Sequence, residues 1–181
     1  WNGWSYFSAN DGTFGTELWK TDGTTANTQL VADIKVGGTR DSSFPGKFFS
    51  NATRLYFAAN DGVNGTELWE SDGTAAGTIM PADYRPGSGS TSPKIFPSMG
   101  GSFVLFRGNN NNGWGTELHS YQGNITPGLA GTFTPEADVN PQGGRDGSGG
   151  FNNAEGVVDA GYGVGLFGAP AYDLTDPLNP V

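Results

Sequence analysis

Cysteine is absent from this 181-residue chain, and basic residues are scarce. Without cysteine the protein can form no disulfide, no thiolate nucleophile and no cysteine-based zinc site. Nine scattered Lys and Arg residues stand against eighteen Asp and Glu residues, and the formal net charge is −9. Because no basic patch is available to neutralise phosphates, we expect no nucleic-acid partner. An acidic surface instead favours solubility and cation binding.

Long apolar segments are also missing. The strongly apolar runs, such as residues 103–106, are far too short to span a bilayer, so we expect no membrane insertion. No stretch has the periodicity of an amphipathic helix. A signal peptide is not visible and the first residue is Trp1 rather than Met, which indicates a processed chain or a fragment.

Glycine and aromatic residues are abundant instead. Gly occurs 31 times and aromatic residues make up 13% of the chain, whereas hydrophobic residues together reach only 35%. A core of this composition must be built from a few large rings rather than from many aliphatic side chains. Glycine, together with Asn, Asp, Ser and Thr, suits many tight turns between short strands.

A repeat with a period of fifty residues organises the chain. Three copies are recognisable, the third is degenerate, and residues 164–167 resemble the start of a fourth. Self-similarity at a fixed period predicts a repeated structural unit. The matching segments are Tyr-Phe-x-Ala-Asn-Asp-Gly at 6–12 and 56–62, Gly-Thr-Glu-Leu-Trp at 15–19 and 65–69, Gly-Thr-Glu-Leu-His at 115–119, and Asp-Gly-Thr at 22–24 and 72–74.

Each unit is predicted to form about four short antiparallel strands, as in a propeller blade. The Tyr-Phe segment is aromatic and alternating, and the Thr-Glu-Leu-Trp segment alternates polar with apolar residues. Asp-Gly is a hairpin signal, because glycine adopts positive φ without steric cost. The returning strand is expected at 28–32 or 78–80, and a further strand at 44–49 or 94–96 precedes the next Tyr-Phe segment.

The predicted fold is therefore all-β and β-propeller-like, with repeated four-stranded antiparallel units. About three blades, near 1–50, 51–100 and 101–142, make up residues 1–142, and a Gly/Pro-rich extension covers 143–181. Propellers usually have about four to eight blades, so this number does not close a ring comfortably. We therefore expect as partners other protein chains or the rest of a longer chain. Within this chain, residues 151–158 or 163–167 are candidates to supply a missing strand to the first blade.

The repeat also supports a resemblance. The pattern NDGxxGTELWxxDGTxxGT, clearest at residues 60–78, resembles the ELWxxDGT repeats of bacterial secreted and surface proteins. The resemblance covers residues 1–126 and extends more weakly to 167. It implies propeller-like blades and an extracellular or cell-surface location. It transfers no catalytic residue.

The Asn-Asp-Gly loops are the best candidates for a metal site. Calcium takes six to eight oxygen ligands, often from carboxylates and loop carbonyls around a turn. The alternative is that Asn and Asp hold the turn by hydrogen bonds to their own backbone. The candidate calcium ligands are Asn10, Asp11 and Glu17 in the first copy, and Asn60, Asp61 and Glu67 in the second.

Other candidate residues belong to the repeat itself. Trp19 and Trp69 are either sugar-stacking platforms, with carbohydrate as the partner, or structural residues that fill space between blades. His119, the only histidine, replaces a repeat Trp and is expected to pack in the core. We expect a non-enzymatic extracellular or cell-surface module for binding, adhesion or structural assembly. The alternative is a polysaccharide-acting hydrolase, which needs two carboxylates converging in a cleft.

Overall fold

The computed structural model describes residues 1–38, 40–96, 103–111 and 116–122, together with the backbone of three later strands. These residues contain no helix, so the fold is all-β as predicted. The strands are β1 (Ser5–Asn10), β2 (Thr16–Thr21), β3 (Gln29–Ala32), β4 (Gly46–Ser50), β5 (Leu55–Asn60), β6 (Thr66–Ser71), β7 (Lys94–Phe96), β8 (Phe103–Asn109), β9 (Thr116–Gln122), β10 (Thr132–Ala137), β11 (Gly156–Asp159) and β12 (Val164–Phe167).

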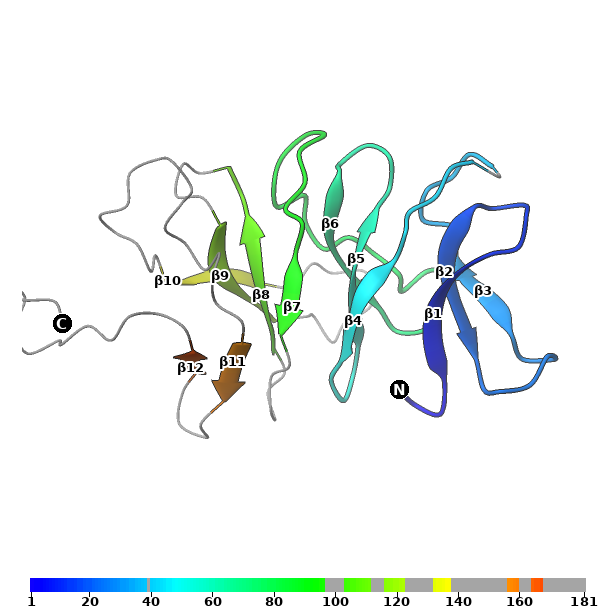
Figure 1. Ribbon diagram of the computed structural model, residues 1–181, viewed down its shortest axis with the longest axis horizontal. Helices are drawn as coiled ribbons and strands as arrows, with labels where there is room; N and C mark the ends of the chain where they lie inside the picture. Colours follow the sequence, from blue (N-terminus) through cyan, green and yellow to red (C-terminus); the bar gives the residue numbers. More distant parts are fainter. Residues whose placement is uncertain are drawn as a thin grey trace, which may run out of the picture.

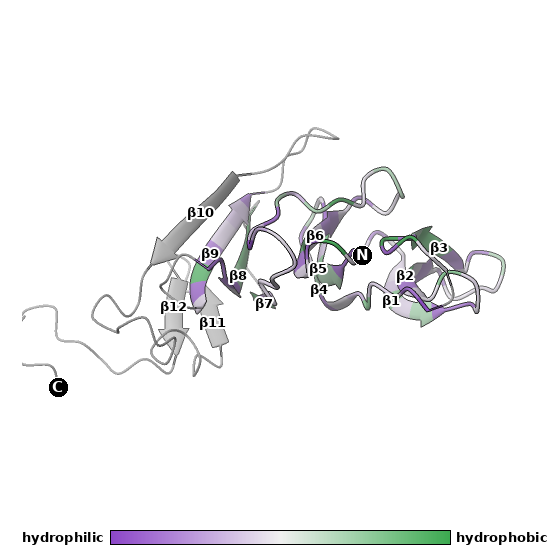
Figure 2. Cartoon of the chain, turned by 90° about the horizontal axis from the view of Figure 1, so that it is seen from above, coloured by the Kyte–Doolittle hydropathy of each residue, from purple (hydrophilic) through white to green (hydrophobic). Residues whose placement is uncertain are grey.

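All strand pairs are antiparallel, and the sheets follow one another in chain order along the molecule (Figure 1). The first sheet has the order β1-β2-β3 and the second β4-β5-β6. The third has the order β10-β9-β8-β7, and β11 pairs with β12 in a two-stranded sheet. A view from above shows the first three sheets as successive layers (Figure 2).

The pairing register confirms that the sequence repeat is a structural repeat. Phe7 lies opposite Trp19 in the first sheet, and Phe57 lies opposite Trp69 in the second. In the third sheet Phe106 lies opposite His119, so His119 occupies the place of the repeat Trp. Residues fifty apart in the first two sheets therefore occupy equivalent positions.

The number of strands differs between the units. The first sheet has three strands, and the second has three strands plus an isolated bridge between Glu70 and Ile79. Only the third has four. As predicted, β4 and β7 precede the next Tyr-Phe strand, and they pair with β5 and β8. The described residues do not form a closed barrel or ring of sheets.

Two hydrophobic clusters join the sheets. The first lies between the first and second sheets, and the second lies between the second and third. Both contain the repeat aromatic residues, as the composition predicts. The first cluster contains Leu18, Val31, Ala32, Ile34, Leu55, Phe57, Ala59 and Trp69, and the second contains Tyr56, Leu68, Val104, Phe106 and Tyr121.

The predicted extension at 143–181 lies outside the described residues, except for β11 and β12. These two strands pair with each other, and no partner of β1 comes from them. The expectation that this part of the chain completes the first sheet is therefore wrong for both strands. Within the described residues there is also no helix with the length and apolarity that a membrane crossing requires.

Candidate functional site

The first Asn-Asp-Gly loop is held by its own side chains. The Oδ1 atom of Asn10 accepts a hydrogen bond from the Gly12 N–H at 2.7 Å. The Oδ1 atom of Asp11 accepts from the N–H groups of Thr13 and Phe14 at 2.8 and 3.1 Å. These backbone donors lower the pKa of Asp11, because they stabilise the charged form.

The second loop repeats this geometry. Asn60 Oδ1 accepts from the Gly62 N–H at 2.6 Å, and Asp61 Oδ1 accepts from the Val63 and Asn64 N–H groups at 2.8 Å each. Partial burial acts to raise the pKa of Asp61, but the hydrogen bonds from Asn64 and Val63 outweigh it and lower the pKa. Both loops thus have the turn-holding geometry weighed above as the alternative to calcium binding.

Glu17 performs a different task from Asp11. Its side chain is fully buried. Its carboxylate accepts hydrogen bonds from the Ile34 N–H at 2.9 Å, the Ser43 N–H at 2.8 Å and the Ser43 hydroxyl at 2.5 Å. Ile34 and Ser43 lie in the connector between β3 and β4, at residues 33–45. Glu17 therefore fixes the path of the chain from the first sheet to the second.

Glu67 fixes the path of the next connector, at residues 80–93, which leads from the second sheet to the third. Its carboxylate accepts from the Thr91 N–H at 2.8 Å and from the Thr91 hydroxyl at 2.5 Å. Burial raises the pKa of Glu67, although the bonds from Thr91 act in the opposite direction. Ser43 and Thr91 precede equivalent strands, and this Ser/Thr position was not recognised in the sequence because the two connectors differ in length.

Backbone contacts at the same junction explain the glycine of the Gly-Thr-Glu segment. Thr16 N–H donates to Ser42 Oγ at 2.8 Å, and Thr66 N–H donates to Ser90 Oγ at 2.9 Å. A Cβ atom on Gly65, which has a φ of +72°, would lie 2.3 Å from the carbonyl oxygen of Gly89. The close approach and the positive φ both require glycine here.

In each copy the three predicted calcium ligands are thus divided: the Asn and Asp lie in a turn between two strands, and the Glu lies at a buried contact with the connector. Among the described residues, no three Asp, Glu, His or Cys side chains are grouped so that they could hold a metal ion. The carboxylate oxygens of Glu17 and Glu67 already accept hydrogen bonds from N–H and hydroxyl donors. This arrangement gives calcium binding no support.

One buried acid lies outside the repeat pattern. Glu70 replaces Lys20 of the first copy and is fully buried. Its Oε2 atom accepts from the Tyr121 hydroxyl at 3.0 Å, and its Oε1 atom has no hydrogen-bond partner among the described residues. Burial raises the pKa of Glu70, while Tyr121 and the charge of Arg54 lower it. A carboxyl group sealed between two sheets has no access to a polymeric substrate.

Trp69 and His119 pack in the core. Trp69 is 8% exposed and belongs to the first hydrophobic cluster, so it is not a platform for sugars. Trp19, at the equivalent position of the end sheet, is half-buried. His119 is buried, as predicted, and its Nδ1 atom lies 2.5 Å from the Tyr84 hydroxyl. Burial lowers the pKa of His119.

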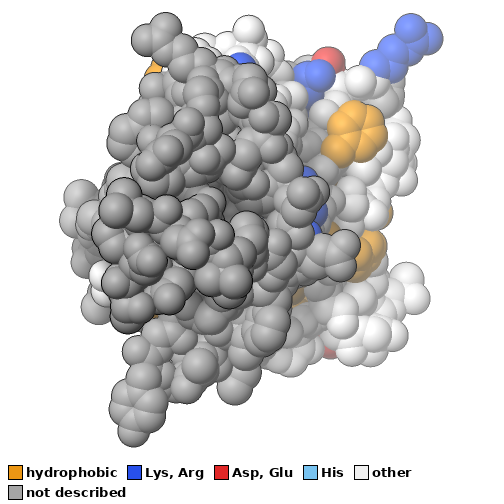
Figure 3. All heavy atoms as spheres, turned by 60° about the vertical axis from the view of Figure 1, so that its left-hand side comes forward, with side chains coloured by type: hydrophobic (Ala, Val, Ile, Leu, Met, Phe, Trp, Pro, Cys, Tyr) orange, Lys and Arg blue, Asp and Glu red, His pale blue; other side chains and the backbone are white. Residues whose placement is uncertain are grey.

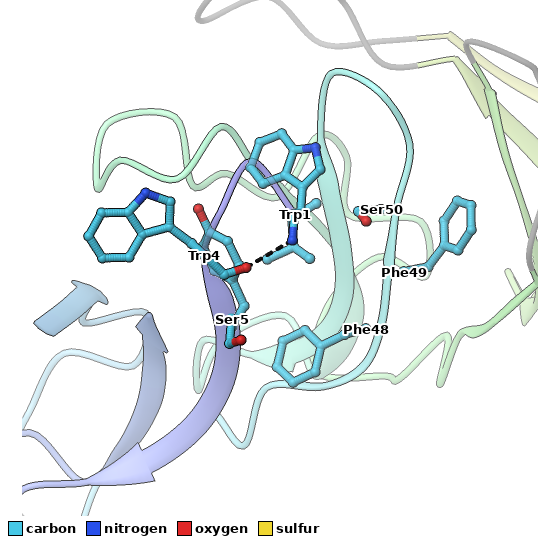
Figure 4. A pocket seen from close by; sticks show the side chains of 8 residues that line it. Trp1, Trp4, Ser5, Phe48, Phe49 and Ser50 are labelled. Atoms are coloured by element: carbon cyan, nitrogen blue, oxygen red, sulfur yellow. Dashed lines mark hydrogen bonds between the residues drawn. The ribbon is translucent and has the colours of Figure 1, made fainter. Parts of the chain in front are cut away.

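A hollow of about 270 Å³ lies between the first and second sheets and is lined mainly by aromatic side chains. Figure 4 shows the indole of Trp1 and the ring of Phe48 on opposite sides of the opening, with Ser5 of β1 between them. We call this site the aromatic pocket. Its lining residues are Trp1, Trp4, Ser5, Tyr6, Phe48, Phe49, Ser50 and Leu55.

The rings of the aromatic pocket are held by local contacts. The Trp1 amino group donates to the Trp4 carbonyl at 2.8 Å, and the Trp1 and Tyr6 ring centroids are 5.8 Å apart. The Lys20 ammonium lies 4.7 Å from the Trp4 ring centroid and donates to the Gly73 carbonyl at 2.8 Å. Lys20 therefore links the pocket wall to the Asp-Gly turn of the second sheet.

The lining of the aromatic pocket has few ionisable groups. No lining residue carries a carboxylate, and Tyr6 is the only lining side chain that ionises. Burial, and to a lesser extent the charge of Asp72, raises the pKa of Tyr6. Sequence reasoning missed this pocket because Trp1 and Trp4 do not belong to the repeat. The departure from the repeat at Trp1-Asn2-Gly3-Trp4 was the available signal.

The part of the surface visible in Figure 3 is a weaker candidate for a binding site than the aromatic pocket. On the face shown in Figure 3, hydrophobic side chains appear as separate spots among polar ones, and the visible Lys and Arg side chains are separate too.

Comparisons of the chain with protein family models, curated proteins and solved structures found no match. The resemblance to ELWxxDGT repeat proteins therefore stays a prediction.

Proposed function

We propose that this protein is a non-enzymatic module for binding and structural assembly, which acts outside the cell or on its surface. The aromatic pocket carries this proposal. It is an open hollow lined mainly by aromatic side chains with a few hydroxyl groups, and its lining lacks the paired carboxylates of a hydrolase. The sheets are proposed to be successive blades of a propeller-like array, in which each blade needs a neighbour on both sides.

The use of the repeat carboxylates supports the same proposal. Glu17 and Glu67 are engaged in holding connectors, and the turn acids Asp11 and Asp61 are engaged in holding loops. These acids serve the architecture of the repeat. An acidic surface with scattered basic residues suits a soluble partner rather than a nucleic acid.

The test uses one panel of neutral oligosaccharides and short peptides with two measurements. Quenching of tryptophan fluorescence reports binding, because Trp1 and Trp4 line the pocket. Release of reducing ends reports hydrolysis. We expect quenching by at least one member of the panel, without release of reducing ends.

Two results would contradict the proposal. Sustained release of reducing ends by the purified protein would favour the hydrolase alternative. Binding that is unchanged after Trp4→Ala would place the ligand elsewhere on the molecule.

A further inference from the structure

We infer that the aromatic pocket and the open edge of β1 together accept one extended polypeptide strand, which carries aromatic residues in the pattern of β4. This inference rests on the proposed function, because it names the partner of the same pocket. The argument comes from the second and third sheets, where the equivalent position is already filled.

In the second sheet β4 fills this position. Ser50 pairs with Leu55, and Phe49 pairs with Tyr56. The residues fifty positions before Leu55 and Tyr56 are Ser5 and Tyr6, which line the aromatic pocket. Within the described part of the chain, β1 pairs only with β2, so its other edge is open. The pocket therefore lies where the first sheet would receive its counterpart of β4.

The third sheet fills the same position with β7. Phe96 pairs with Leu105, and Ile95 pairs with Phe106. Leu105 and Phe106 correspond to Tyr56 and Phe57, so Phe96 corresponds to Phe49. The two occupants thus share three properties: an antiparallel direction, an extended backbone and a Phe opposite the same repeat position, which is Tyr56 in the second sheet and Leu105 in the third.

The packing of β4 shows how an added strand would be held. The Phe49 ring stacks on Tyr56 at 6.5 Å, and the Phe48 ring packs on Phe57 at 5.9 Å, so the two rings project to opposite sides of β4. Contacts also join β4 to β7 and β1 to β4. A strand on β1 would cover Tyr6 as β4 covers Tyr56.

The turn at residues 1–4 marks where an added strand with the direction of β4 and β7 would end. In the β4–β5 hairpin the Asn51 N–H donates to the Arg54 carbonyl at 3.0 Å. The equivalent bond runs from the Trp1 amino group to the Trp4 carbonyl at 2.8 Å. A strand antiparallel to β1 therefore ends beside Trp1. It gains hydrogen bonds from the open strand edge and specificity from the aromatic pocket, as in other cases of strand addition.

The test is a peptide with the sequence of residues 42–51, labelled with a fluorophore and titrated with the protein. The control peptide replaces the residue equivalent to Phe49 by Asp. We expect saturable binding of the first peptide and binding about tenfold weaker for the control. Hydrogen exchange must also slow at the amides of β1, because strand addition protects them and simple insertion of a ring into the pocket does not.

Matched variants locate the site. Phe48 is 37% exposed and lines the pocket, whereas Phe44 is 71% exposed and does not. Phe48→Ser should weaken peptide binding and Phe44→Ser should not. As a second measurement, residues 42–50 are fused before Trp1, which converts weak association into an intramolecular event. The fused strand should raise Tm by roughly 4 °C or more relative to a scrambled fusion.

Each outcome decides the inference. Peptide binding with slower exchange in β1 supports it. Binding without slower exchange, or no binding together with no rise in Tm of the fusion, overturns it. Oligosaccharide binding with no peptide binding overturns this inference but leaves the proposed function standing. A dimer seen by sedimentation that slows exchange in β1 by itself, and that the peptide does not displace, also overturns it, because a second copy would then cover the pocket.

Discussion

β1 and β5 have nearly the same sequence, Ser-Tyr-Phe-Ser-Ala-Asn and Leu-Tyr-Phe-Ala-Ala-Asn, yet they lie in different environments. None of the six residues of β1 is buried, whereas five of the six residues of β5 are. β5 has β4 along one edge and a sheet on each face. Among the described strands, β1 pairs with β2 alone and lies in the sheet at the end of the row. Burial in a repeat protein is thus decided by the neighbours of a strand, as in other stacked repeats.

The largest expected difference concerns the two equivalent Phe residues. Phe57→Ala should lower the free energy of unfolding by about 3–5 kcal/mol, because it leaves a cavity in the first hydrophobic cluster. Phe7→Ala should cost less than about half of this, since Phe7 is half-buried. Urea denaturation of both variants measures the difference. Equal losses would show that another surface covers the first sheet in solution.

The connector junction should instead behave alike in both sheets. Gly65→Ala places a Cβ atom against Gly89, and Gly15→Ala places one 1.9 Å from the Asp41 carbonyl oxygen. Each substitution should lower the free energy of unfolding by about 3 kcal/mol, because a steric overlap is added to an unfavourable positive φ. Gly12→Ala is the matched control, with positive φ and no atom within 4 Å of the new Cβ. It should cost about 1–2 kcal/mol.

The Asp-Gly turns provide a smaller contrast. A Cβ atom on Gly73 would lie 2.5 Å from the Tyr6 hydroxyl, whereas one on Gly23 meets nothing within 4 Å. Both glycines have positive φ, so this cost cancels in the comparison. Gly73→Ala should be about 1 kcal/mol more destabilising than Gly23→Ala. Tyr6→Phe should reduce that difference in a double mutant, and a difference that survives it would exclude the Tyr6 contact as the cause.

The smallest effect should be the pH dependence caused by Glu70, an acid that the first sheet lacks. Its pKa is higher in the folded than in the unfolded chain, so folding favours its protonated form, and this contribution is lost as the pH rises through the folded pKa. The free energy of unfolding of the wild type, relative to that of Glu70→Gln, should therefore increase as the pH falls from 7 to 5. Chemical denaturation at both pH values tests this. A relative stability that falls toward pH 5 would mean that Arg54 and Tyr121 outweigh burial.

The periodic part of the fold could be predicted from the sequence, and the site could not. A fifty-residue period and alternating Tyr-Phe and Glu-Leu-Trp segments fix the strands and their register, because each strand repeats the same local pattern. The roles of Glu17 and Glu67 depend on connector atoms that lie 17 to 26 residues away. The aromatic pocket depends on Trp1 and Phe48, which the chain brings together only when two sheets stack.

The connector contacts also bear on how the chain folds. Each buried Glu binds atoms of the segment that follows it, at separations of 17, 24 and 26 residues. Such short loops close quickly and at a low entropic cost. A connector can take its native path only after the Thr-Glu-Leu strand that binds it has formed, so each finished sheet is a template for the entry of the next. During synthesis the sheets should therefore fold in order, from the first toward the third, as the ribosome releases the chain.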